Sequence, residues 1–279
     1  MLRKKLQVED LEISYLEGLG GGKEPILLLH GMADTAVVWS NLGDYLASKY
    51  HVIAPDLRGH GESSKPNKDY TFNSAIADLE ALIKSLGWDN KINVLAHSWS
   101  AKLLTIWATK NPQRFRSLIL VDPFFINKIP SFAKITFPFF YRVLPFLKAM
   151  GPFASQEEAE KLAKTLKQYR DWSNLQQQAF WAGIEEKADG TWGSKFTVAA
   201  RNEIFTEVMQ VAGLTEEIKI PTLFIKPEAG LNRTAWQLKP YKTYLKNLQI
   251  SQIPGNHWVH LANPEDFNRT VAEFLAQQK

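Results

Sequence analysis

The chain has 279 residues, a formal net charge of +4 and no cysteine. The absence of cysteine excludes disulfides, thiolate metal sites and a cysteine nucleophile. An apolar fraction of 45% and a charged fraction of 22% are typical of a globular protein with a substantial core. Acidic and basic residues are interleaved along most of the chain, which argues against nucleic-acid binding.

The N-terminal segment 1–18 is charged and alternating, and it lacks the apolar stretch of a signal peptide. No run of about 18 uninterrupted apolar residues occurs, so a membrane-spanning helix is not expected. We therefore predict a cytoplasmic location. No motif predicts a cofactor or a bound metal ion, and the sequence does not indicate an oligomeric state.

Apolar runs of strand length alternate with segments of helical period, which predicts parallel βαβ units. The alternating segments around Leu6 and Ile13 predict a hairpin at an exposed sheet edge. Phe72–Leu86 has the pattern of an amphipathic helix, and Asn263 with Pro264 predicts the start of a last helix. The predicted central strands are Ile26–Leu29, Val52–Ala54, Ile92–Ala96, Leu118–Val121, Thr222–Ile225 and Leu248–Ile253.

The alternation stops between Pro123 and about Gly213, where the pattern is mostly helical and contains no convincing buried strand. We predict a core formed by residues 1–122 and 214–279, with residues 123–213 inserted as a helical cap. Within 124–153 lie nine aromatic and four basic residues and no acidic one. This composition predicts a large pocket for an acyl or aromatic group. A second hypothesis is contact of this face with an anionic membrane or lipid surface.

Residues 94–101, VLAHSWSA, predict a strand that runs directly into a helix through Ser98. A nucleophile elbow needs this sharp turn, which raises the hydroxyl above the carboxyl edge of the sheet. The residues two before and two after the serine must be small. They are Ala96 and Ser100 in place of the usual glycines. A serine that merely caps a helix would give a similar short pattern, so this motif alone leaves both readings open.

His30, Gly31 and Met32 follow the first central strand, where an oxyanion loop would lie. We expect the glycine to let the chain turn, so that the backbone N–H groups of Met32 and Trp99 point at a developing oxyanion. Residues 56–63, DLRGHGES, form a glycine-rich loop after the next strand. Because this loop lacks the lysine and the spacing of a phosphate-binding loop, its side chains are expected to fix the loop itself.

In their order and spacing these motifs, with residues 254–258, PGNHW, resemble the α/β-hydrolase superfamily over nearly the whole chain apart from the cap. The resemblance implies an α/β fold with an eight-stranded, mostly parallel sheet. It implies a nucleophile–acid–histidine triad in which His257 takes the proton of Ser98. A serine at this position argues against the haloalkane dehalogenase and epoxide hydrolase branches, whose attacking group is aspartate.

The triad acid is missing from its usual place. The family most often carries an aspartate in the loop after the strand 222–225, at the position that is Gly230 here. Asp122, at the end of the preceding strand, is the preferred replacement, because some members, such as pancreatic-type lipases, resemble this Asp-Pro arrangement. Glu228 is the alternative acid, and a site without any acid is the third possibility.

The sequence therefore favours a serine hydrolase, carboxylesterase-like or lipase-like, that cleaves a hydrophobic ester through an acyl-enzyme on Ser98. The alternatives of the same class are a thioesterase, a carbon–carbon bond hydrolase and an amidase resembling proline iminopeptidase. A hypothesis of another class is a non-catalytic ligand-binding relative, in which loss of the usual acid would be an early sign of decay. The joint presence of the serine, the histidine and the oxyanion loop argues against it.

Overall fold

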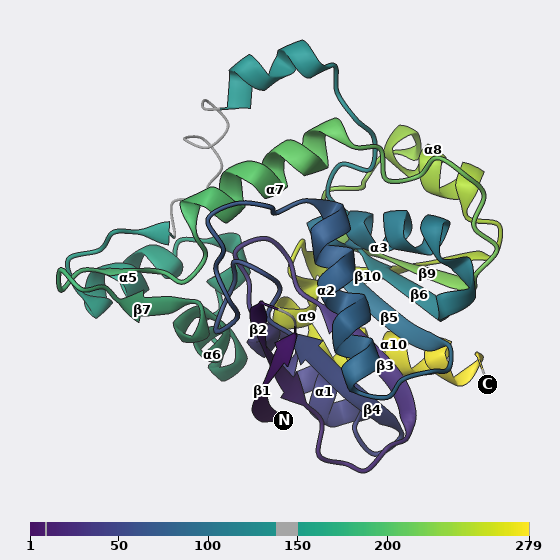
Figure 1. Ribbon diagram of the computed structural model, residues 1–279, viewed down its shortest axis with the longest axis horizontal. Coiled ribbons are helices and arrows are strands. Elements are labelled where there is room, and N and C mark those ends of the chain that lie inside the picture. The colour runs from purple at the N-terminus through teal and green to yellow at the C-terminus, as the bar shows by residue number, and fades with distance from the viewer. Residues whose placement is uncertain (9, 138–149, 279) are drawn as a thin grey trace.

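The computed structural model describes residues 1–8, 10–137 and 150–278. It confirms the predicted α/β-hydrolase fold: helices flank both faces of a mostly parallel eight-stranded sheet (Figure 1). The strand order is β1-β2-β4-β3-β5-β6-β9-β10. The strands of this sheet are β1 (Leu2–Val8), β2 (Leu11–Glu17), β3 (Glu24–Leu29), β4 (Tyr50–Pro55), β5 (Ile92–His97), β6 (Phe115–Val121), β9 (Thr222–Ala229) and β10 (Leu248–Asn256).

Each predicted central strand is present, and most extend further at one or both ends than their apolar runs. The extra residues are held by pairing: Glu24 at the start of β3 pairs with Tyr50 of β4. The N-terminal hairpin is also present, but only β1 lies at the edge. The second strand, β2, pairs with β4 and is largely buried, so the prediction of an exposed edge is wrong for β2.

Two apolar cores lie on opposite faces of the sheet. Along β3, Leu27 and Leu29 belong to one core, whereas Ile26 and Leu28 belong to the other. All four side chains are fully buried, which explains why the central strands appear as continuous apolar runs. The flanking elements are η1 (Ala36–Trp39), α1 (Ser40–Leu46), α2 (Phe72–Ser85), α3 (Trp99–Lys110), η2 (Pro112–Arg114), α8 (Ala235–Tyr244), α9 (Val259–Ala262) and α10 (Pro264–Ala276).

The segment between β6 and β9, which we call the inserted segment (residues 123–213), contributes no strand to the main sheet in its described part. Its helix α7 lies above α2 in the view of Figure 1, and its helix α6 packs against η1 of the core. Its described elements are η3 (Ser131–Thr136), α5 (Gln156–Ala163), η5 (Lys167–Tyr169), α6 (Asn174–Ala182), β7 (Ile184–Glu186), β8 (Trp192–Ser194) and α7 (Val198–Gln210).

The inserted segment also contains a small antiparallel hairpin of β7 and β8. Each strand has only three residues, too few to show an alternating pattern. The turn between them uses Gly190 at φ 79°, a conformation that favours glycine. Residues 138–149 of the aromatic stretch lie outside the described residues. No helix in the described ranges combines the length and the apolar character needed to cross a bilayer.

Candidate active site

Ser98 joins β5 to α3 in a strained conformation. Its φ of 60° and ψ of −119° lie outside the regions that a side-chain-bearing residue normally adopts. The backbone N–H of Ser98 donates to the carbonyl oxygen of Val121 on β6 at 3.0 Å, which fixes the turn beside the end of that strand. Strain of this kind persists where the surrounding structure holds it, and it clusters at functional sites.

The residues flanking the elbow are small because they are enclosed. Ala96 and Ser100 are both fully buried. The Ser100 hydroxyl lies 3.0 Å from the carbonyl oxygen of Leu29 and 2.8 Å from that of His97, and it accepts from the His97 N–H at 3.1 Å. Ser100 therefore ties the elbow to the end of β3. The sequence motif requires only a small residue at position 100, and it gives no indication that Ser100 makes these hydrogen bonds.

His257 follows β10, and its Nδ1 lies 2.7 Å from Oδ2 of Asp122. A carboxylate oxygen accepts, so Nδ1 carries the proton and Nε2 is left as the basic nitrogen. Asp122 ends β6 and is fully buried, whereas the His257 side chain is 12% exposed. Asp122, the acid preferred from the sequence, is thus the carboxylate that His257 contacts.

Four donors surround the Asp122 carboxylate. Besides His257, it accepts from the Leu231 N–H at 2.7 Å, from the Asn232 N–H at 3.1 Å and from Asn232 Nδ2 at 2.9 Å. Burial disfavours the charged form of Asp122. The hydrogen bond and charge of His257, together with the Asn232 and Leu231 donors, outweigh burial and hold the pKa of Asp122 below its usual value. The carboxylate is therefore ionised at neutral pH.

Asn232 was not identified from the sequence. It lies in the loop after β9, and its side chain also donates to the carbonyl oxygen of Pro123 at 2.8 Å. Glu228, the alternative acid, lies near the end of β9 and is exposed, and no hydrogen bond or ion pair joins it to His257 among the described residues.

The residues predicted to form the oxyanion loop, 30–32, follow directly after β3. Met32 lies in a turn outside any helix or strand, and Trp99 is the first residue of α3. In the described part of the chain neither residue's backbone N–H donates to a protein acceptor, so both remain available. Gly31 begins a turn in which the Asp34 N–H donates to the Gly31 carbonyl oxygen at 3.3 Å. A Cβ on Gly31 would lie 2.7 Å from Asp34 Oδ2 and 2.7 Å from His97 Nδ1.

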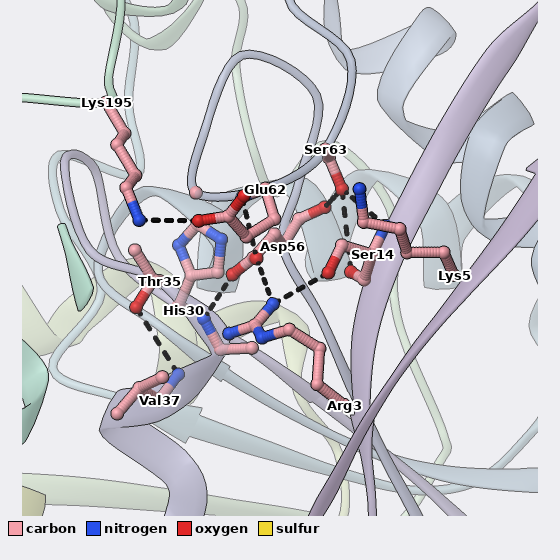
Figure 2. A network of polar contacts seen from close by, with 12 residues as sticks. Arg3, Lys5, Ser14, His30, Thr35, Val37, Asp56, Glu62, Ser63 and Lys195 are labelled. Atoms are coloured by element: carbon pink, nitrogen blue, oxygen red, sulfur yellow. Dashed lines mark hydrogen bonds and ion pairs between the residues drawn. The ribbon is translucent and has the colours of Figure 1, made fainter. Parts of the chain in front are cut away.

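Hydrogen bonds join the loop 56–63 to His30 of the predicted oxyanion loop and to η1. Figure 2 shows Asp56 at the centre of this network, where its carboxylate accepts from Arg3 Nη1 at 2.7 Å. The same carboxylate accepts from the Ala36 N–H at 2.6 Å and the Glu62 N–H at 3.0 Å. The buried ring of His30 donates through Nδ1 to the Gly31 carbonyl at 2.8 Å and accepts the Leu57 N–H at 3.0 Å.

The inserted segment reaches the same loop. Lys195 Nζ contacts Glu62 Oε1 at 2.5 Å (Figure 2), and the hydrogen bond and charge of Lys195 lower the pKa of Glu62 despite its partial burial. The ring of Phe196 stacks on His60 with a centroid separation of 4.2 Å. Burial and the neighbouring His30 hold the pKa of His60 well below its usual value, so this ring is neutral.

A small pocket lies between the predicted oxyanion loop and the inserted segment. None of its lining residues is charged. Ser98 and His257 are not among them, and the pocket meets the site at Met32. A larger cleft lies elsewhere, along α2, α3 and the end of α7. The pocket is lined by Met32, Ala33, Met150, Gln168, Tyr169, Phe180, Gly183, Ile184 and Ser194.

Among the described residues no cluster of three side chains could hold a metal ion. No hydrogen bond joins Ser98 Oγ to His257 in the described structure, although Ser98 is only 8% exposed. Such bonds are often long without substrate and tighten when it binds, so this geometry does not disfavour the pair.

The strained serine between β5 and α3 and the histidine after the last strand are the arrangement of an α/β-hydrolase. A family model described as the alpha/beta hydrolase fold matches residues 24–205. The chain therefore belongs to the α/β-hydrolase family, and it is a hydrolase.

Relatives over the full length differ in their named activities. A fluoroacetate dehalogenase from Burkholderia sp. is 23% identical over 99% of this chain and 94% of the relative. Among solved structures, an E-2-(acetamidomethylene)succinate hydrolase aligns over 99% of both chains, with a TM-score of 0.82 and 20% identity. An esterase from Thermogutta terrifontis aligns over 100% of this chain and 99% of the other, with a TM-score of 0.76 and 22% identity. At these identities the structural matches establish the fold alone.

Proposed function

We propose that the chain is a serine esterase that cleaves a neutral, hydrophobic ester through an acyl-enzyme on Ser98. The observation that carries this proposal is the 2.7 Å bond between His257 Nδ1 and Asp122 beside the strained elbow of Ser98. That bond fixes the histidine tautomer whose Nε2 is free to act as a base.

In the proposed reaction, His257 Nε2 takes the proton of Ser98 while the serine Oγ attacks the ester carbonyl. The oxygen of the tetrahedral intermediate receives hydrogen bonds from the N–H groups of Met32 and Trp99. Collapse of the intermediate expels the alcohol, which takes the proton back from His257. A water molecule then attacks the acyl-enzyme by the same steps and releases the acid.

The uncharged lining of this pocket supports a neutral acyl or aromatic group. A substrate carboxylate would be desolvated there without a cation among the lining residues. We propose that residues 123–213 act as a cap over this pocket, with residues 1–122 and 214–279 as the core. The ion pair of Lys195 with Glu62 and the stacking of Phe196 on His60 support this role.

Ser98 distinguishes this proposal from dehalogenase or epoxide hydrolase chemistry, because those branches attack with an aspartate. Thioester, amide and carbon–carbon bond cleavage use the same serine chemistry, so they are alternatives that only substrates can separate. A non-catalytic binding protein would keep the fold without a reactive serine.

Two measurements test the proposal. A fluorophosphonate probe should label the wild type and not Ser98→Ala; an unlabelled wild type would contradict a serine enzyme and favour a binding protein. Nitrophenyl acetate, butyrate and octanoate should then be compared with nitrophenyl hemisuccinate. We expect kcat/KM for butyrate to exceed that for hemisuccinate by about 100-fold, because the hemisuccinate carboxylate would be partly buried without a cationic partner. Equal values would contradict a neutral substrate.

A further inference from the structure

The turn that carries His257 is held by contacts on three sides. The His257 ring bonds to Asp122, and the His257 carbonyl oxygen lies 2.9 Å from Nε2 of His97. The third contact comes from Asn256, directly before His257 in the chain. The side-chain oxygen of Asn256 accepts the Trp258 N–H at 2.8 Å, so this side chain closes a short turn around His257.

The other end of the Asn256 amide reaches the inserted segment. Its Nδ2 donates to the carbonyl oxygen of Lys167, the first residue of η5, at 2.8 Å. One amide group therefore uses its oxygen to shape the turn and its nitrogen to hold the turn on η5. In addition, η5 packs against α9, the helix that begins at Val259, just after the turn. The inserted segment thus contacts the chain on both sides of His257.

The same element, η5, forms part of the wall of the pocket beside Met32. Gln168 and Tyr169 are both buried, and both line this pocket. The Tyr169 ring packs edge-on against the ring of Phe180 on α6, another lining residue, with centroids 5.3 Å apart. The carbonyl group of Lys167 therefore holds the histidine turn, while the next two residues of η5 line the pocket.

A group that fills the pocket can affect the histidine turn only if it favours one arrangement of η5 over another. An acyl chain in the pocket gains contacts with Gln168 and Tyr169 only while η5 lies in the position described. The bond from Asn256 to Lys167 is also made only in that position. Filling the pocket and fixing the turn therefore favour the same position of η5.

We propose that Asn256 is a positioning residue that links occupancy of the acyl pocket to the placement of His257. The inference rests on the proposed esterase function and extends it to the dependence of the rate on acyl-chain length. A butyryl group in the pocket stabilises η5, η5 holds Asn256, and Asn256 holds the turn of the base. Acylation and deacylation both use His257, so both steps gain. An acetyl group, which has only one methyl group to place in the pocket, gains less.

Two variants of Asn256 separate the link to η5 from the shape of the turn. The hydroxyl group of Asn256→Ser can still accept the Trp258 N–H, but it is too short to reach the Lys167 carbonyl oxygen. Asn256→Ala loses both contacts. We expect kcat on nitrophenyl butyrate to fall about fivefold in Asn256→Ser, the equivalent of one neutral hydrogen bond. The change in KM should be smaller, because the lining residues of the pocket are unaltered.

The fall in kcat on nitrophenyl acetate should be smaller than on butyrate, so the butyrate-to-acetate ratio of kcat should decrease in Asn256→Ser. Asn256→Ala should lose at least as much kcat as Asn256→Ser, and thermal melting verifies that both variants fold. Wild-type kcat in Asn256→Ser would overturn the proposal, because the turn alone would then explain the residue. An unchanged butyrate-to-acetate ratio in both variants would also overturn it.

A second readout does not depend on activity. Hydrogen–deuterium exchange of the amides of residues 164–172 and 256–262 should be faster in Asn256→Ser than in the wild type, because the bond between the two segments is lost. Unchanged exchange in both segments would overturn the proposal even if the chain cleaves none of the esters. Faster exchange without any ester cleavage would support the link between Asn256 and η5 and contradict the esterase function alone.

Discussion

A Cβ atom on Gly230 would lie 2.6 Å from Oδ2 of Asp122, closer than real Cβ contacts allow. The position that usually carries the family's acid is therefore filled by the carboxylate of a different strand. Asp122 reaches it from β6 with a φ of 38°, another strained conformation. With Asp122 in this conformation, residue 230 has no room for a side chain.

Gly230→Ala should therefore damage both stability and activity. The added methyl group overlaps the Asp122 carboxylate and pushes it away from His257, at a cost of about 1–3 kcal/mol in the free energy of unfolding. Urea unfolding measures that loss, and nitrophenyl ester hydrolysis should show a fall in kcat. Ala229→Gly, a change at the exposed neighbouring residue, is the matched control and should leave kcat alone. A fully active and stable Gly230→Ala would contradict the shared-site interpretation.

Replacing the acid itself gives the largest predicted effect on catalysis. Asp122→Asn keeps the size of the side chain but removes the charge that fixes the His257 tautomer, so kcat should fall by about 10⁴-fold. Glu228→Gln, at the exposed end of β9, should change kcat by less than about twofold. Steady-state kinetics on nitrophenyl butyrate checks both. If Asp122→Asn keeps full activity, the assignment of the acid is wrong.

The sequence could predict those parts of the fold and site whose signal is local. The strands are apolar runs, and Ser98 and His257 stand in short motifs at the ends of β5 and β10. The bonding role of Ser100 and the contribution of Asn232 were missed because their partners are distant in the chain; Ser100 bonds to Leu29, and Asn232 binds a carboxylate 110 residues away. Likewise, only the packing against Asp122 reveals why residue 230 is a glycine.

The aromatic part of the inserted segment offers a test of contact with lipids. Phe132 and Ile135 in η3 are 82% and 87% exposed, and Lys128 and Lys134 lie beside them without an acidic residue between. We expect the protein to float with vesicles that contain anionic lipid and less with neutral ones. The double variant Phe132→Ser/Ile135→Ser should reduce flotation, whereas Trp236→Ser on α8, 73% exposed, should not. Absence of flotation with anionic vesicles would contradict this hypothesis.

Lys102 connects α3 to both ends of the inserted segment. Its fully buried Nζ donates to the carbonyl oxygens of Phe125 at 2.9 Å, of Asn127 at 2.7 Å and of Val208 at the end of α7. Burial lowers the pKa of Lys102 to about 7, and the charge of Glu207 opposes this only in part. The ammonium group thus holds the entry and exit of the inserted segment on the helix that begins after Ser98.

Lys102→Met should leave three buried carbonyl groups without their donor, which predicts a loss of roughly 2 kcal/mol in the free energy of unfolding at pH 7. The difference from the wild type should also depend on pH. Between the folded pKa of about 7 and the ordinary value of 10.5, the unfolded wild type binds more protons at this residue than the folded one. Stability therefore rises with pH in this window for the wild type relative to Lys102→Met, and the gap between them widens. Urea unfolding at pH 7, 8 and 9 measures the gap, and a gap that stays constant or narrows would contradict the lowered pKa.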